Sequence, residues 1–167
     1  MLDNKIKEIE DLAGLIDSLK KQGKKIVHCH GCFDIVHPGH IEHFIDAKKQ
    51  GDVLVVTVTP DRFVEKGPGR PFFNEKIRLK QLAAQGTIDY VALNKWSTAI
   101  ETLRLIKPDI YVKGKEVLGN KDIDKIQTTE KISSNLSLEE EAVKSVGGEL
   151  YLTDQITFSS SKIINQS

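Results

Sequence analysis

The sequence predicts an α/β protein with a single Rossmann-like, doubly wound domain and a mostly parallel sheet. Short apolar segments that suit buried strands alternate with longer segments whose apolar residues recur at helical spacing. Strand–helix–strand crossovers produce this alternation, and they place helices on both faces of a sheet. At 167 residues and 39% hydrophobic content the chain can form one core but not two. We therefore expect one domain over residues 1–167.

The first element is predicted to be a covering helix within residues 1–23, and nothing in it suggests chemistry. Gly23 suits its C-terminal end. Its apolar residues recur at helical spacing: Ile6, Ile9, Leu12, Leu15, Ile16 and Leu19.

The next segment is predicted to be a strand, a loop and a helix. Residues 25–29 suit a short buried strand, and residues 41–50 suit a helix that ends before Gly51. Open α/β sheets bind ligands at such strand-to-helix loops. Gly31 allows close backbone approach to a phosphate, and the free N–H groups of the following helix attract the same anion. His37 and His40 lie three residues apart, so both can face one phosphate.

Further strands are predicted at residues 52–58, 89–93, 110–112 and 149–152. Asn74 is expected to cap a helix over residues 75–85. Capping-box spacing predicts two more helix starts, at Thr98 with Glu101 and at Ser137 with Glu140. Residues 115–136 are polar and weakly patterned, so we expect an insertion whose role, as a lid or a dimer contact, stays open.

Two loops carry cations beside the expected site. Lys66 and Arg70 lie in a Gly/Pro-rich segment that suits neither helix nor strand. Such a loop is either an ordinary solvated loop or a mobile cover that neutralises phosphate charge. Lys113 follows the strand at residues 110–112 and is expected at the same edge of the sheet.

Cys29 and Cys32 form a C-x-x-C pair that favours a competing hypothesis. The pair could be redox-active, or part of a metal site completed by His28 or His30. No second cysteine pair exists in the sequence, and Cys29 ends a strand instead of opening a helix. We therefore expect free thiols with packing or loop roles, and no metal site.

The run from Gly31 to His40 resembles the Gly-x-Phe-Asp-x-x-His-x-Gly-His signature of the cytidylyltransferase-like nucleotidyltransferases. Segments Lys66-Gly67, Arg70-Pro71 and Val112-Lys113-Gly114 are similar to the sugar-phosphate branch of that family. The resemblance covers about Lys25 to Ile164. It implies catalytic roles for His37, His40 and Lys66. It implies nucleotide binding by Gly31, Cys32, Phe33, Gly39, Lys113, Ser159, Ser160 and Ser161, and substrate binding by Asp34, Arg70 and Arg78.

The resemblance implies transfer of a nucleotidyl group from a nucleoside triphosphate to a sugar or polyol phosphate, with Mg²⁺ accompanying the triphosphate. Glycerol-phosphate cytidylyltransferases carry an arginine shortly before their terminal Ser-Thr-Thr, whereas residues 153–158 here carry no cation. This favours ATP and the heptose-phosphate adenylyltransferase branch, with activated sugars for surface glycans as the product. CTP with glycerol 3-phosphate is the alternative, and a metal or redox module or a non-catalytic nucleotide sensor is the alternative of another class.

The amino-acid composition limits which binding partners are expected. The chain has 24 Lys and Arg residues and 24 Asp and Glu residues, so its formal net charge is zero. A neutral chain without a basic block argues against extended nucleic-acid binding. No apolar run suits a membrane span, and the charged N-terminus is unlike a signal peptide, so we expect a cytoplasmic protein. The resemblance further implies a homodimer that works with a separate sugar kinase.

Overall fold

The computed structural model describes residues 2–115 and 126–154. Within these ranges one six-stranded sheet has the strand order β1-β4-β3-β2-β5-β6, and every pairing is parallel. The predicted doubly wound α/β class is confirmed. The strands are β1 Ile6–Lys7, β2 Ile26–Gly31, β3 Val53–Val58, β4 Tyr90–Leu93, β5 Ile110–Gly114 and β6 Glu149–Thr153.

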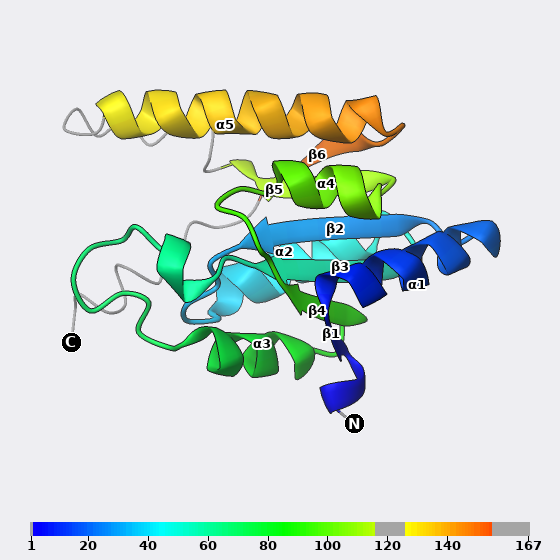
Figure 1. Ribbon diagram of the computed structural model, residues 1–167, viewed down its shortest axis with the longest axis horizontal. Coiled ribbons are helices and arrows are strands. Elements are labelled where there is room, and N and C mark those ends of the chain that lie inside the picture. The colour runs from blue at the N-terminus through cyan, green and yellow to red at the C-terminus, as the bar shows by residue number, and fades with distance from the viewer. Residues whose placement is uncertain (1, 116–125, 155–167) are drawn as a thin grey trace.

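Helices cover both faces of this sheet (Figure 1). The α-helices are α1 Ile9–Lys21, α2 Pro38–Lys48, α3 Glu75–Ala83, α4 Ile100–Ile106 and α5 Ile126–Ser145, with 3-10 turns η1 Leu2–Asn4 and η2 Asp61–Phe63. Helices α1 and α4 lie in front of the sheet in Figure 1, and α2 lies behind it. Helix α5 packs against α4 and β6.

Alternation along the strands sorts the core into two layers. Successive side chains of a strand point to opposite faces. Val27, Cys29 and Val56 therefore pack with α2 and α3, together with Phe44 and Leu82. The other layer joins α1, α4 and α5 to the sheet through Ile16, Val55, Ile106, Tyr111 and Val143. The polar residues His28, His30 and Thr57 occupy positions of the same phase as this second layer, near the carboxyl ends of β2 and β3.

Three aspartates fasten the opposite, amino-terminal edge of the sheet. Asp52 accepts a hydrogen bond from the Lys25 N–H at 2.8 Å, just before β2. Asp109 accepts from the Ile26 N–H at 2.8 Å, and Asp89 accepts from the Leu54 N–H at the same distance. Each carboxylate thus joins the residue before one strand to the start of its neighbour. These bonds fix the register of adjacent parallel strands.

The chain start differs from the predicted single helix. Ile6 and Lys7 form the edge strand β1, which pairs with Val91 and Ala92, and the helix begins only at Ile9. Ile6 continued the helical periodicity, but its pairing with β4 satisfies the backbone in an extended form. Tertiary pairing has overridden the local pattern here.

The helix starts follow the capping predictions only in part. The Ile77 N–H donates to Asn74 Oδ1 at 3.1 Å, so the expected cap of α3 is present. The two predicted capping boxes are wrong, because α4 begins after Ala99 without a side-chain cap and α5 begins at Ile126. Ser137 therefore lies within α5, and residues 126–136 of the expected insertion are helical. Helix α2 starts at Pro38, three residues earlier than predicted, so His40 belongs to its first turn.

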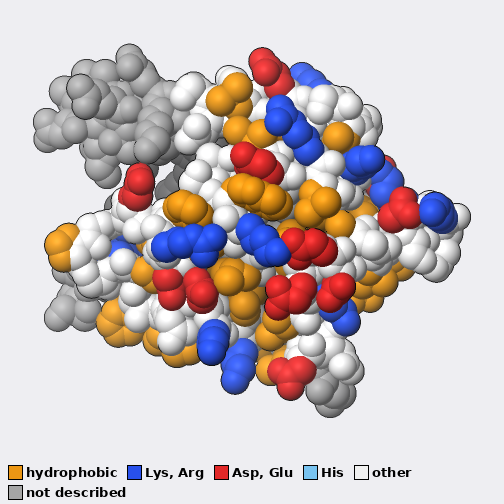
Figure 2. Space-filling model, in the orientation of Figure 1, with side chains coloured by type: hydrophobic (Ala, Val, Ile, Leu, Met, Phe, Trp, Pro, Cys, Tyr) orange, Lys and Arg blue, Asp and Glu red, His pale blue; other side chains and the backbone are white. Residues whose placement is uncertain are grey.

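The surface over α1 and α4 carries both signs of charge. Lys and Arg side chains lie interspersed with Asp and Glu side chains on the face shown in Figure 2. This mixture agrees with the formal net charge of zero. Among residues 2–115 and 126–154, no helix is both long and apolar enough to cross a membrane.

Candidate active site

The strand order itself locates the ligand-binding edge. Strand β2 pairs with β3 on one side and with β5 on the other, so the chain reverses its winding direction between β2 and β5. Open α/β sheets bind ligands beyond the carboxyl ends of the strands at such a switch point. Here those ends carry Gly31 and Lys113. The Lys113 ammonium donates to the His30 carbonyl at 3.3 Å, which joins the two strand ends.

Gly31 and Phe33 shape the loop that leaves β2. A Cβ atom built on Gly31 would lie 3.0 Å from Phe33 Cζ, so the ring occupies the space of a side chain there. Phe33 adopts a φ of 49°, in the left-handed region. Its ring packs edge-on against His40 with centroids 5.3 Å apart, and against Phe44 at 5.2 Å. The loop backbone therefore passes close to the first turn of α2.

His37 and His40 form a stacked pair at the start of α2. Their ring centroids are 3.7 Å apart with an interplanar angle of 23°. The His37 backbone N–H donates to His40 Nδ1 at 3.3 Å, and the His40 ring also hydrogen-bonds to the Ile35 backbone. Gly39 lies between them in the first helical turn, where backbone N–H groups lack partners within the helix.

The His40 ring is neutral at physiological pH. Burial, together with the neighbouring His37, His43 and Lys66, lowers its pKa to about 3. A neutral imidazole can donate a hydrogen bond without adding a full charge. The exposed Lys66 carries a positive charge within electrostatic reach of His40. Its loop turns at Gly67 and Gly69, which have φ values of 95° and 74°.

Asp34 holds the loop after residue 69. Its carboxylate is fully buried and accepts from Arg70 Nε and the Phe72 N–H at 2.8 Å, and from the Phe73 N–H at 2.9 Å. Burial alone would raise the pKa of Asp34, but these donors outweigh it and keep the pKa below its usual value. The observed contacts give Asp34 and Arg70 a positioning role. Their contact with substrate stays a prediction.

Arg78 is a second internal brace. Its fully buried guanidinium donates to the Phe73 carbonyl at 3.0 Å, the Cys32 carbonyl at 2.7 Å and Asp61 Oδ1 at 2.7 Å. It thereby joins the signature loop, η2 and the start of α3. These bonds use the side chain within the protein, so a direct substrate contact for Arg78 also stays a prediction.

The two cysteines lie in different environments. Cys29 is fully buried in the layer under α2 and α3, and burial raises its thiol pKa to about 12. Cys32 is half-buried, and both thiols are free. Among residues 2–115 and 126–154 no three His, Cys, Asp or Glu side chains are placed to hold a metal ion. The predicted Ser159, Ser160 and Ser161 lie outside the described residues.

A cavity of about 280 Å³ opens beside the strand ends, on the α4 and α5 side. The β4–α4 loop closes one wall, because Asn94 Nδ2 donates to the Trp96 and Thr98 carbonyls at 2.8 Å each. Glu139 closes another wall from α5 and accepts from the Tyr111 hydroxyl at 2.8 Å. The cavity is lined by His30, Gly31, Thr59, Ser97, Thr98, Lys113, Asn135, Leu136 and Glu139.

Of this lining, the sequence predicts only Gly31 and Lys113 as site residues. His28 and His30 were considered as metal ligands with Cys29, yet strand alternation puts Cys29 on the opposite face. The signal for a polar face was present in the sequence. Two histidines two residues apart in one strand, and one threonine in the apolar run of the next, share a phase.

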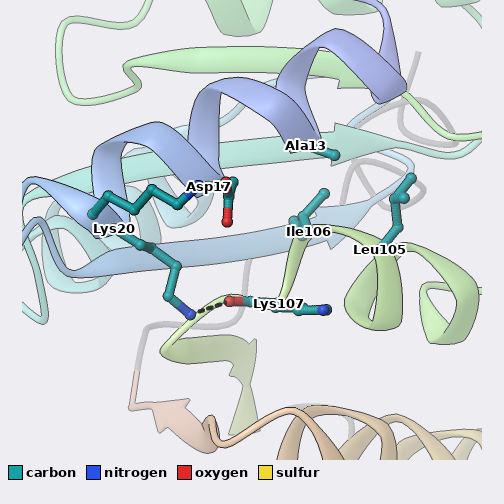
Figure 3. A pocket seen from close by; sticks show the side chains of 7 residues that line it. Ala13, Asp17, Lys20, Leu105, Ile106 and Lys107 are labelled. Carbon is teal, nitrogen blue, oxygen red and sulfur yellow. Dashed lines mark hydrogen bonds and ion pairs between the residues drawn. The ribbon is translucent and has the colours of Figure 1, made fainter.

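A larger hollow lies elsewhere, between the last turns of α1 and α4 (Figure 3). Its volume is about 470 Å³, and it is lined by Ala13, Asp17, Lys20, Lys21, Leu105, Ile106 and Lys107. Lys20 Nζ donates to the Lys107 carbonyl across it at 2.7 Å. It lies at the amino-terminal edge of the sheet and contains none of the predicted site residues.

The fold and the site define a class: a doubly wound α/β nucleotidyltransferase with a histidine pair at its phosphate-binding loop. The family model for cytidylyltransferase-like proteins matches residues 28–166, and the chain belongs to that family. The resemblance seen in the sequence and the assignment as an enzyme are thereby confirmed.

Curated relatives agree with this assignment. The bifunctional protein HldE of Desulfatibacillum aliphaticivorans is 37% identical over 163 residues, which cover 96% of this chain and 30% of the relative. The bifunctional protein HldE of Geobacter metallireducens is 43% identical over 114 residues, 67% of this chain and 23% of the relative. The chain thus spans less than a third of the length of these relatives.

Two solved structures share the fold. The lipopolysaccharide core biosynthesis protein from Thermoplasma volcanium matches with a TM-score of 0.59 and 25% identity, over 82% of this chain and all of that chain. The pantoate-beta-alanine ligase from Francisella tularensis matches with a TM-score of 0.55 and 16% identity, over 95% and 75% of the two chains. At that identity the second match supports the fold alone.

Proposed function

We propose that the chain transfers a nucleotidyl group, AMP in preference to CMP, from a nucleoside triphosphate to a sugar or polyol phosphate. A phosphate oxygen of the acceptor forms a bond to the α-phosphorus, the bond to the β-phosphate oxygen breaks, and pyrophosphate leaves. The acceptor phosphate is already an adequate nucleophile. The protein therefore has to bring two anions together and stabilise the charge that develops on the α-phosphate oxygens.

The stacked His37–His40 pair carries this proposal. Both rings lie at the start of α2, on either side of a glycine that permits close approach of phosphate. The neutral His40 ring is proposed to donate a hydrogen bond to a phosphate oxygen. Lys66 adds positive charge from a loop with two positive-φ glycines, which suits a cover that closes over the substrates. Lys113 offsets charge from the β5 side.

Magnesium is proposed to arrive with the triphosphate. Ions of this kind bridge triphosphate oxygens and reduce their charge. The described residues contain no three-ligand cluster, so they do not fit a resident metal site. We assign no protein ligand to the ion.

The relatives support a sugar-phosphate acceptor and a separate second activity. The HldE proteins are called bifunctional, and this chain matches less than a third of their length. We propose that a sugar kinase supplies the acceptor phosphate, that the product serves surface-glycan synthesis, and that the protein acts in the cytoplasm as a homodimer. A sugar 1-phosphate is the acceptor expected for the heptose-type branch.

A pyrophosphate-release screen tests this proposal. Four nucleoside triphosphates are combined with a panel of sugar 1-phosphates and polyol phosphates, with size-exclusion chromatography to measure the oligomeric state. We expect turnover with ATP and a sugar 1-phosphate. Efficient turnover of CTP with glycerol 3-phosphate would overturn the choice of substrates. Binding of a triphosphate without turnover across the whole panel would favour a nucleotide sensor.

A further inference from the structure

A buried carboxylate lies beside the ammonium group of Lys113. Glu139 comes from α5 and is buried. Its Oε2 atom lies 3.9 Å from Lys113 Nζ, and the Lys113 side chain is 19% exposed. The same ammonium donates a hydrogen bond to the His30 carbonyl at 3.3 Å. The positive charge of Lys113 thus has a negative partner within the protein itself.

Two hydrogen bonds hold the carboxylate of Glu139 in place. The Tyr111 hydroxyl donates to Glu139 Oε2 at 2.8 Å. The Ala99 N–H donates to Oε1 at 3.4 Å, at the limit of a hydrogen bond. Burial and the neighbouring Glu139 raise the pKa of the Tyr111 hydroxyl well above its ordinary value, so the hydroxyl keeps its proton and acts as the donor. Moving the carboxylate away from Lys113 would break these bonds.

A fixed carboxylate is an unexpected neighbour for a group that binds phosphate. Lys113 lies in β5 at the ligand-binding edge of the sheet, where the proposed function uses its charge to offset phosphate charge. Like charges at close range repel, so Glu139 opposes the binding of an anion there. A buried, ionised carboxylate is also costly unless an opposite charge accompanies it. The ammonium of Lys113 reduces this second cost, because it supplies that charge.

The two side chains differ in their freedom to respond to a ligand. Lys113 lines the cavity at the strand ends, and an ammonium carries three N–H donors on a flexible stem. Glu139 is held by donors from β5 and from the residue before α4. A phosphate group can therefore approach Lys113 from the open side while Glu139 keeps its position. The ammonium then divides its charge between the carboxylate and the phosphate.

We propose that Glu139 is the internal counter-ion of Lys113 and sets how tightly the site holds a phosphate group. Glu139 is a positioning residue in this scheme, because it acts on the ligand through Lys113. It keeps the ammonium near the end of β2 in the free protein, and it limits the positive charge that a phosphate meets. Moderate affinity favours release of the pyrophosphate that the proposed reaction forms. This inference rests on the proposed function, which uses Lys113 to offset phosphate charge.

Isothermal titration calorimetry of the whole chain with Glu139→Gln tests the sign of the effect. The variant keeps the size of the side chain and one acceptor oxygen, but it removes the negative charge. We expect inorganic pyrophosphate or glucose 1-phosphate to bind about fivefold more tightly than to the wild type, because a repulsive charge near the ligand is lost. The ligand whose binding tightens identifies the phosphate that faces Lys113. A purely structural role would leave both affinities unchanged or weaken them, and either result would overturn the proposal.

Glu140→Gln is the matched control on the same helix. It makes the same change of charge one residue further along α5, but the Glu140 side chain is 39% exposed and paired with Lys144. We expect both affinities to stay unchanged in this variant. Equal tightening in Glu140→Gln and Glu139→Gln would show that the net charge of the chain sets the affinity, and would contradict the proposal.

A double-variant cycle tests the route through Lys113. Lys113→Met alone should weaken binding of the same ligand, and unchanged affinity would overturn the proposal even if Glu139→Gln failed to fold. In the Lys113→Met background we expect Glu139→Gln to change the affinity by less than about twofold, since the counter-ion has no cation to act on. Equal tightening in both backgrounds would contradict the positioning role. A wild-type protein that binds neither phosphate nor ATP would overturn the proposed function, and this outcome is recognised before the variants are compared.

Discussion

The two edges of the sheet use polar side chains in opposite ways. At the amino-terminal edge, Asp52, Asp89 and Asp109 each accept a backbone N–H near the start of a neighbouring strand. At the carboxyl-terminal edge, His30 is buried and lines the cavity, and His40 is half-buried beside the loop that follows β2. The aspartates complete the backbone bonding of the sheet. The histidines instead lie where the ligand-binding edge of the sheet meets open space.

This difference is a better guide to function than the size of a hollow. The hollow beside the aspartates has a volume of about 470 Å³, but the side chains of Asp17 and Lys21 on its rim are 67% and 77% exposed. The cavity at the other edge has about 280 Å³ and is lined by His30 and Glu139, each less than 9% exposed. A polar group is costly to bury, so its burial beside open space indicates a role.

The largest effect is expected from the histidine pair after β2. His40→Ala and His37→Ala should each lower turnover about 10²-fold or more, because each removes a donor to the charge that develops on phosphate. Binding of the triphosphate should weaken far less. Steady-state kinetics with a direct binding measurement separates the two effects. Glu42→Ala on the exposed side of the same helix is the control, and a histidine variant with unchanged turnover would exclude that residue from the mechanism.

The aspartates should affect stability and leave turnover unchanged. Asp109→Ala leaves the Ile26 N–H without its acceptor, so we expect the free energy of unfolding to fall by about 1–3 kcal/mol. Urea denaturation measures this change. Asp17→Ala is the control, because its ion pair with Lys21 is exposed. A loss of turnover in Asp109→Ala without a loss of stability would show that the two edges are not separate in function.

The buried histidines should make stability depend on pH. Burial lowers the pKa of His28 to about 3, whereas the unfolded chain has the ordinary value of about 6.5. The unfolded state therefore binds a proton first as the pH falls. The stabilisation is complete above about pH 6.5 and is lost toward pH 3, at up to about 1.4 kcal/mol per pH unit for this one group. Urea midpoints between pH 7 and pH 5 measure the slope. His28→Gln should flatten it, and parallel curves for the two proteins would contradict the assignment.

The smallest effect is expected from the cysteines. Cys29→Ala combined with Cys32→Ser should keep most of the turnover, because Cys29 packs on the face away from the histidines of β2. The purified wild-type protein should contain no stoichiometric zinc. Elemental analysis measures the metal, and about one zinc per chain that disappears in the double variant would favour the metal hypothesis.

The fold class and the signature loop could be predicted because local patterns encode them. Alternating strand and helix patterns indicated the doubly wound class, and the run from Gly31 to His40 indicated a phosphate-binding loop. The strand at Ile6 could not be predicted, because its conformation depends on pairing with Val91. The start of α5 was misplaced because Ser137 has the spacing of a cap but lies inside a longer helix.

The roles of individual site residues were harder to predict than the site itself. A sequence shows that Asp34 and Arg78 are charged, but not that their own chain supplies their partners. It shows a histidine at positions 28 and 30, but not that one hydroxyl from the next strand bridges them. Such roles depend on contacts between segments that are distant in sequence. Strand phase gives part of the answer, since it predicts which residues share a face.

The β4–α4 loop carries Trp96, whose fluorescence can report on the surroundings of this loop. Trp96 is the one tryptophan in the sequence, and its carbonyl is held by Asn94 immediately before Ser97 and Thr98 reach the cavity. The indole is partly exposed, so its fluorescence emission depends on the water around this loop. We therefore expect a ligand that enters the cavity to change the emission of this single fluorophore, without a label and without turnover.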